Sequence, residues 1–229
     1  MTNSTRPHTQ ATQHASESRV VYGVARQRFL AGALLFLFGL VALMGIITAE
    51  AFYPGYNAGV QEISDLGATR PPNSVILQPS ASIFNTTMMV SGVLALAATY
   101  FVHQAFRDRV VTVALGLLGL GVLGVGVFDG SEAPMHGIFA LLTFFSGAVS
   151  AVVASRVIET PFKYLSVAVG GFVLLLLGSL IVLGLLGIPH PLAFLGMGGV
   201  ERYVAYPTLL WTLGFGGYLM APVPEQDAA

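Results

Sequence analysis

The sequence predicts an all-α polytopic membrane protein, with six transmembrane helices in one bundle and a structured outer loop that carries a short amphipathic helix. Of its 229 residues, 55% are hydrophobic and only 9% are charged, whereas a soluble domain covers its surface with about 25% charged residues. Uncharged stretches of about twenty residues recur along the chain, and each can cross a hydrocarbon core of about 30 Å as a helix. Basic and acidic residues also separate between alternate connectors, as they do in membrane proteins.

The chain begins with a polar segment, and residues 1–25 are predicted to form a disordered cytoplasmic tail. A Ser-, Thr- and Gln-rich composition offers too little apolar surface to offset the entropy lost on ordering. The apolar run that starts at Phe29 is too long for the core of a signal peptide, so we expect it to remain as the first span. The transmembrane domain is predicted over residues 26–221, and a short cytoplasmic C-terminal tail over residues 222–229. The six predicted spans are Phe29 to Thr48, Phe84 to Phe106, Val110 to Phe128, His136 to Ser155, Tyr164 to Leu186 and Tyr203 to Met220.

The charges predict the orientation of these spans. Lys and Arg are enriched in cytoplasmic loops, and alternating helices put most of them on the side of the N-terminus. Both termini are therefore predicted to be cytoplasmic, in a multi-pass protein of the cell membrane. The basic residues on the inner side are Arg19, Arg26, Arg28, Arg107, Arg109, Arg156 and Lys163, and the acidic residues on the outer side are Glu50, Glu62, Asp65, Asp129, Glu132 and Glu201.

The third span is rich in glycine, and this composition predicts close helix packing. Small residues let helix backbones approach one another in lipid, so we expect this helix to be central in the bundle. The glycines are Gly116, Gly119, Gly121, Gly124 and Gly126.

The longest polar stretch after the tail, residues 55–74, separates the first two spans. Asn57 is a good N-cap, Gly67 is a good residue to end a helix, and Val60, Ile63 and Leu66 recur about once per turn. This pattern predicts a two-turn amphipathic helix at the outer interface. It would form part of a structured cap over the outer mouth of the bundle.

Polar residues at this outer face are the candidate functional residues. The predicted structural residues of the cap are Glu62, Arg70, Glu201 and Arg202, and Glu62 and Asp65 are expected to pair with the two arginines. The candidate catalytic residues are Asp65, His136 and Ser64, because a carboxylate, an imidazole and a hydroxyl can supply a general base and a nucleophile. The candidate metal ligands are Asp65, Asp129, Glu132 and His136.

A structural interpretation competes with each of these roles. Asp129 and Glu132 lie where a helix begins, so a favourable interaction with the helix dipole explains them without chemistry. His136 lies at the edge of an apolar span, where a hydrogen bond to a loop carbonyl would satisfy it.

Several classes of protein are excluded or disfavoured. The chain has no cysteine, so disulfides, thiolate nucleophiles and iron–sulfur clusters are excluded. Its net charge of −1 offers no basic surface for nucleic acid. No phosphate-binding loop and no HExxH metal motif occurs.

The chain resembles the prokaryotic and archaeal membrane family known as domain of unknown function 998. The resemblance rests on Tyr56, Ile63 to Gly67, Phe84-Asn85 and His136, and on the GGxERxxxYPxLLW pattern from Gly198 to Trp211. It implies a helical membrane bundle of about this size with no established activity. More distantly, the chain is similar to DRAM- and Sfk-like six-helix membrane proteins, and Ser64, Asp65 and His136 resemble residues of a membrane hydrolase superfamily that includes the alkaline ceramidases.

Three functional hypotheses follow. The first is a multi-pass membrane protein of unknown activity with a polar cap, rich in acids and histidine, on its extracellular face; the lipid bilayer is its expected partner and a lipid is a candidate ligand. The second is a metal-dependent hydrolase that acts on lipid headgroups or amides and uses a divalent metal such as zinc. The third is a carrier of small solutes or ions, which requires polar residues deeper in the bundle.

Overall fold

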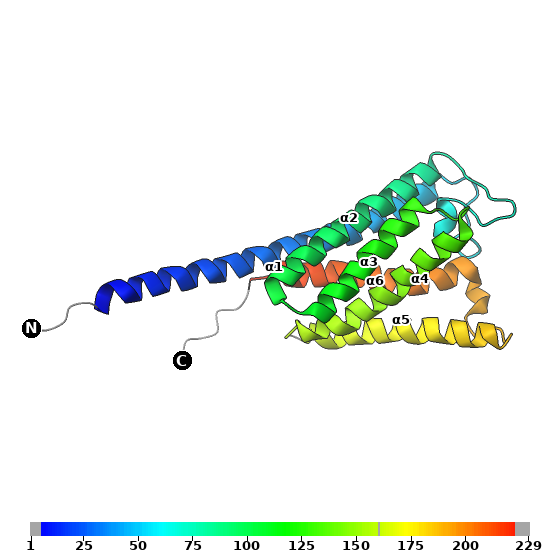
Figure 1. Ribbon diagram of the computed structural model, residues 1–229. Helices are drawn as coiled ribbons and strands as arrows, with labels where there is room; N and C mark the ends of the chain where they lie inside the picture. Colours follow the sequence, from blue (N-terminus) through cyan, green and yellow to red (C-terminus); the bar gives the residue numbers. More distant parts are fainter. Residues whose placement is uncertain (1–5, 160, 223–229) are drawn as a thin grey trace, which may run out of the picture.

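The computed structural model describes residues 6–159 and 161–222, and all regular structure in that part of the chain is helical. The long helices lie side by side in one bundle (Figure 1). Short 3₁₀ turns, η1 to η3, occur in the connectors. The long helices are α1 (Arg6–Ala51), α2 (Ser80–Phe106), α3 (Arg109–Val127), α4 (Ala133–Val153), α5 (Phe162–Leu185) and α6 (Gly196–Met220), and the turns are η1 (Ser64–Leu66), η2 (Ala154–Arg156) and η3 (Ala193–Leu195).

The predicted spans agree with these helices to within a few residues at most ends, except at the starts of α1 and α6. Five of the long helices, α1 to α5, are long and apolar enough to cross a membrane. Helix α6 has 25 residues but is less apolar, because it contains Glu201 and Arg202 near its start and several Gly, Tyr and Thr residues beyond them. The crossing of the membrane by all six helices therefore stays a prediction.

Helix α1 begins earlier than the first predicted span. It starts at Arg6, within the segment for which composition predicted disorder, and its first part extends beyond the bundle (Figure 1). Extending an existing helix needs no new nucleation, a factor that composition alone does not weigh. The predicted C-terminal tail lies outside the described residues, apart from Pro222.

The helices pack in chain order, and the bundle closes where α1 meets α6. Helix α3 lies between α2 and α4, whereas α5 packs on α4 and α6 at the edge of the bundle. Of the five apolar helices, α3 is the most buried and α5 the least. Leu175 and Leu185 of α5 are 76% and 84% exposed, as expected for side chains that face lipid tails.

Contacts at one end of the bundle place the middle of α1 beside the end of α6. Arg28 donates hydrogen bonds to the carbonyl oxygens of Tyr218 and Ala221, at 3.0 and 3.4 Å. At the same end, Arg156 pairs with Asp108 at 2.7 Å and joins two short connectors. The residues between α1 and α2, 52–79, lie at the opposite end (Figure 1) and are called the cap below.

The glycines of α3 face neighbouring helices at close range. A Cβ atom on Gly121 would lie 2.6 Å from Thr143 Oγ1 and 2.7 Å from the Thr143 backbone nitrogen. The backbones of α3 and α4 therefore approach one another more closely at this point than any side chain would allow. Gly116 differs, because its nearest neighbour would be Thr99 Cγ2 at 3.6 Å, an ordinary contact.

This difference gives a matched pair of variants. Gly121→Ala is expected to lower the free energy of unfolding by about 1–3 kcal/mol, because the added methyl group forces α3 and α4 apart. Gly116→Ala is expected not to lower it and to raise it by up to about 1 kcal/mol, because alanine is the better helix former and the added methyl group fits. Denaturant unfolding in detergent micelles measures both values, and equal effects of the two substitutions would contradict this packing.

Candidate functional site: the cap and the cavity beneath it

The cap is irregular in structure, with two tight turns in place of the predicted amphipathic helix. Asn57 shapes the first turn, since its Oδ1 accepts hydrogen bonds from the backbone N–H groups of Gly59 and Val60. The second turn is η1. Ile63 and Leu66 are buried, but Val60 is 68% exposed, so the three residues do not share one face. An isolated two-turn helix is marginal in water, and contacts with the bundle determine the conformation here.

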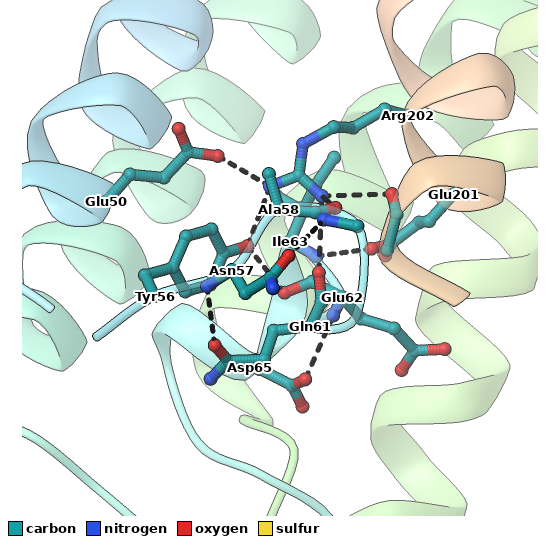
Figure 2. Close-up of polar contacts among 12 residues, drawn as sticks. Glu50, Tyr56, Asn57, Ala58, Gln61, Glu62, Ile63, Asp65, Glu201 and Arg202 are labelled. Atoms are coloured by element: carbon teal, nitrogen blue, oxygen red, sulfur yellow. Dashed lines mark hydrogen bonds and ion pairs between the residues drawn. The ribbon is translucent and has the colours of Figure 1, made fainter. Parts of the chain in front are cut away.

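Arg202 of α6 anchors the cap to the bundle. Its Nη2 donates to Glu50 Oε1 of α1 at 2.6 Å and to the Tyr56 hydroxyl at 2.7 Å. Its Nη1 lies within hydrogen-bond distance of three carbonyl oxygens, and Figure 2 shows the guanidinium surrounded by these groups. The side chains of Arg202 and Glu50 are only 13% and 25% exposed. The three carbonyl oxygens belong to Ala58, Gln61 and Gly198, at 2.8, 3.2 and 2.9 Å.

Tyr56 extends this contact into the cap. The Arg202 guanidinium lies 5.5 Å from the centre of the Tyr56 ring, a favourable position for a cation over an aromatic face. The Tyr56 hydroxyl in turn donates to the Glu62 carbonyl at 2.8 Å. Burial raises the pKa of Tyr56 to about 12, so the hydroxyl keeps its proton and continues to donate.

The first turn of α6 fits against the cap because it contains glycine. A Cβ atom on Gly198 would lie 2.6 Å from the carbonyl oxygen of Ala58. The backbone N–H of Gly199 donates to the carbonyl of Gly59 at 3.2 Å. A side chain at position 198 would therefore separate the cap from α6.

The remaining predicted cap residues take different partners. Glu62 pairs with Arg70 at 2.6 Å, but the Arg70 side chain is 61% exposed. Burial raises the pKa of Glu62, and the positive charge of Arg70 partly opposes that rise. Asp65 accepts the Glu62 backbone N–H at 2.9 Å, and so stabilises the turn without an arginine. Glu201 accepts the backbone N–H of Ile63.

A cavity of about 80 Å³ lies beneath the cap, in the middle of the bundle. It is large enough for several water molecules or a small ligand. Five helices and η1 contribute to its wall, which is almost entirely apolar. The lining residues are Phe38, Ala42 and Ile46 of α1; Ile63 and Ser64 of the cap; Phe84 and Met88 of α2; Leu118, Val122 and Val125 of α3; His136, Ala140, Thr143 and Phe144 of α4; and Glu201, Val204, Ala205, Thr208 and Leu209 of α6.

Two of the predicted catalytic residues line this cavity, and the third does not. Ser64 and His136 are buried there, and the partly buried Glu201 lines the same wall, whereas Asp65 is directed to the cap backbone. His136 Nδ1 lies 2.8 Å from the carbonyl oxygen of Phe128, which is the loop contact that its structural interpretation predicted. No hydrogen bond joins Ser64 to His136 within the described ranges.

The predicted metal ligands do not come together. Asp129 accepts hydrogen bonds from the backbone and hydroxyl of Ser131, and Glu132 is exposed at the start of α4. Among residues 6–159 and 161–222, no group of three or more His, Asp or Glu side chains could hold a metal ion. The zinc-dependent hydrolase hypothesis gains no support from this arrangement.

Sequence reasoning missed two features of the site. It assigned Glu201 to the structure of the cap, whereas the residue also lines the cavity. It placed Glu50 among the outer acids without a partner, whereas the structure pairs it with Arg202. The available signal was the position of Glu50 at the outer end of the first span, because a carboxylate at that depth needs a partner.

Comparison with known proteins gives a family. The family model described as "Protein of unknown function (DUF998)" matches residues 29–217. The matched segment includes the cap, His136, Glu201 and Arg202. Searches of curated proteins and of solved structures found no match, and the more distant similarities suggested by the sequence stay predictions. Because the model covers most of the chain, the protein belongs to the DUF998 family of proteins of unknown function.

Proposed function

We propose that this protein is a multi-pass membrane protein that binds a small, mostly apolar molecule in the cavity beneath its cap. The observation that carries the proposal is the cavity itself, which is lined by apolar side chains and by a few polar groups near the cap. Binding sites between the helices of a bundle commonly have this composition, in which apolar walls provide affinity and a few polar groups fix the orientation. The cap provides the outer wall, with Ile63 and Ser64.

A second feature supports a cavity that receives a ligand. The hydroxyl of Thr208, a residue of the cavity wall, is buried and has no hydrogen-bond partner among the described residues. A buried polar atom without a partner costs about 1–3 kcal/mol. A ligand or a bound water molecule in the cavity would remove that cost.

We also propose that the cap faces the outside of the cell and that both termini are cytoplasmic. The inner end would then carry Arg26, Arg28, Arg107, Arg109, Arg156 and Lys163, in agreement with the enrichment of basic residues in cytoplasmic loops. The contact between Arg28 and the end of α6 supports an even number of crossings.

The orientation can be tested directly because the chain has no cysteine of its own. Ser74 in the cap and Glu159 in the connector between α4 and α5 are both exposed. In intact cells, a membrane-impermeant maleimide is expected to label Ser74→Cys and not Glu159→Cys, whereas both variants should react after permeabilisation. The reverse pattern would contradict the proposed orientation.

The binding proposal predicts a loss of affinity when the cavity is filled. Three pentyl compounds, n-pentylamine, 1-pentanol and pentanoate, sample different head groups on one apolar chain. At least one is expected to raise the melting temperature of the protein in phosphatidylcholine nanodiscs, because a ligand that binds only the folded state stabilises it. Ala205→Phe, which adds a ring inside the cavity, is expected to abolish that shift.

The control is Ala168→Phe, which makes the same substitution at an exposed position of α5. It is expected to keep the shift. If none of the three compounds shifts the melting temperature of the wild type, or if both phenylalanine variants respond as the wild type does, the proposed binding function is wrong.

A further inference from the structure

The hydrogen-bond donors near the cap end of the cavity already donate to other groups of the protein. Arg202 follows the lining residue Glu201 in α6, and its guanidinium is occupied by Glu50, Tyr56 and backbone carbonyl oxygens, as Figure 2 shows. The backbone N–H of Ile63 is taken by Glu201. No Lys or Arg side chain lines the cavity.

The polar groups that remain are mostly acceptors. The carbonyl oxygen of Phe128 can only accept, so His136 Nδ1 must carry a hydrogen, and in the neutral ring Nε2 is then a bare acceptor. The Thr143 hydroxyl donates to the carbonyl of Phe139 at 2.8 Å, so toward the cavity its oxygen can only accept a hydrogen bond. Only the Ser64 and Thr208 hydroxyls can act as either donor or acceptor.

Glu201 is the strongest of these acceptors. Its Oε2 accepts the Ile63 N–H, and Oε1 has no hydrogen-bond partner among the residues that the structure describes. A carboxylate in an apolar cavity needs a cation or several donors to offset its desolvation. The wall supplies mostly acceptors around it, so the ionised form of Glu201 would be stabilised by a bound group that brings donors and a positive charge.

We propose that the ligand of this cavity carries an amine on an apolar chain, and that Glu201 binds its ammonium group with His136 Nε2 as a second acceptor. The inference rests on the binding function proposed above and specifies its ligand class. An ammonium offers three donors and a positive charge and accepts nothing, which complements this wall. An anionic head group would meet an ionised Glu201 with like charge or require it to stay protonated, and a neutral alcohol would gain no charge-assisted hydrogen bond.

The acid–base properties of Glu201 agree with this assignment. The residue lies before the sixth predicted span, and burial raises its pKa to about 8. The negative charges of Glu62 and Asp65 add to the rise, whereas Arg202 and the Ile63 N–H oppose it. Tyr56 and Tyr206 also lie near Glu201, and His136 faces the same cavity from α4. The empty site is therefore mostly neutral near pH 7, and a bound ammonium would stabilise the ionised carboxylate.

The same pentyl series tests the ligand class. In the wild type, n-pentylamine is expected to bind at least about tenfold more tightly than 1-pentanol, the ratio that corresponds to one charge-assisted hydrogen bond, and pentanoate is expected to bind most weakly. Glu201→Gln keeps an acceptor for the Ile63 N–H and removes the charge, so it should bring the affinity for the amine to within about twofold of that for the alcohol.

Glu62→Gln is the matched control, because Glu62 is a nearby acid of the cap that does not line the cavity. It should keep the preference for the amine. If Glu201→Gln does not fold, the pH dependence of the wild type gives a second test. Binding of n-pentylamine should strengthen between about pH 6 and pH 9, as Glu201 loses its proton and the amine, with a pKa of about 10.4 as in lysine, keeps its own.

The outcomes separate the two proposals. Failure of all three pentyl compounds to bind contradicts the binding function. Binding of 1-pentanol or pentanoate as tight as that of n-pentylamine leaves the binding function standing and overturns the amine assignment. Competition of n-pentylamine by phosphatidylethanolamine nanodiscs, but not by phosphatidylcholine nanodiscs, would identify the amine as a lipid headgroup, and equal behaviour of the two lipids would identify it as a free amine.

Discussion

The cap depends on one partly buried cation, Arg202. Its guanidinium joins a carboxylate of α1, a tyrosine and two carbonyl groups of the cap, and a carbonyl of its own helix. The desolvation of such a group is costly unless every donor finds a partner, and here the cap backbone supplies the partners that the helices do not. The cap is therefore held by these polar contacts at one edge and by the burial of Ile63 and Leu66 in the core of the bundle.

Two adjacent residues of α6 have opposite roles in this arrangement. Successive residues of a helix point about 100° apart, so Arg202 is directed toward α1 and the cap while Glu201 is directed toward the cavity. The positive charge of Arg202 is used to hold the cap against α1. Glu201 bonds one backbone N–H of the cap and keeps its other oxygen for the cavity. One turn of α6 thus contributes both the residue that holds the cap, Arg202, and an acid that lines the cavity, Glu201.

The bilayer makes the helices predictable from sequence, because an uncharged stretch of about twenty residues has few other ways to satisfy its backbone. The glycines of α3 were predictable for a similar reason, since close helix approach is the ordinary role of small residues in membranes. The cap was less predictable. Val60, Ile63 and Leu66 have helical spacing, but a segment this short takes its conformation from Arg202 and Gly198, which lie far from it in sequence. The partner of Glu50 could not be predicted from sequence either, because Glu50 and Arg202 are separated by 152 positions.

The role of Arg202 can be tested most directly by hydrogen exchange of the backbone amide of Ile63 in the wild type, in Arg202→Ala and in Arg70→Ala. Both arginines form a 2.6 Å ion pair with a glutamate, but the Arg70 side chain is 61% exposed and that of Arg202 is 13% exposed. Loss of one partner of a buried pair costs about 3–5 kcal/mol, and loss of an exposed pair about 0–1 kcal/mol. Arg202→Ala is therefore expected to speed exchange at Ile63 by at least about a hundredfold, and Arg70→Ala by less than about tenfold. Equal exchange rates in the two variants would contradict the account, because the cap would then be held by something other than the guanidinium of Arg202.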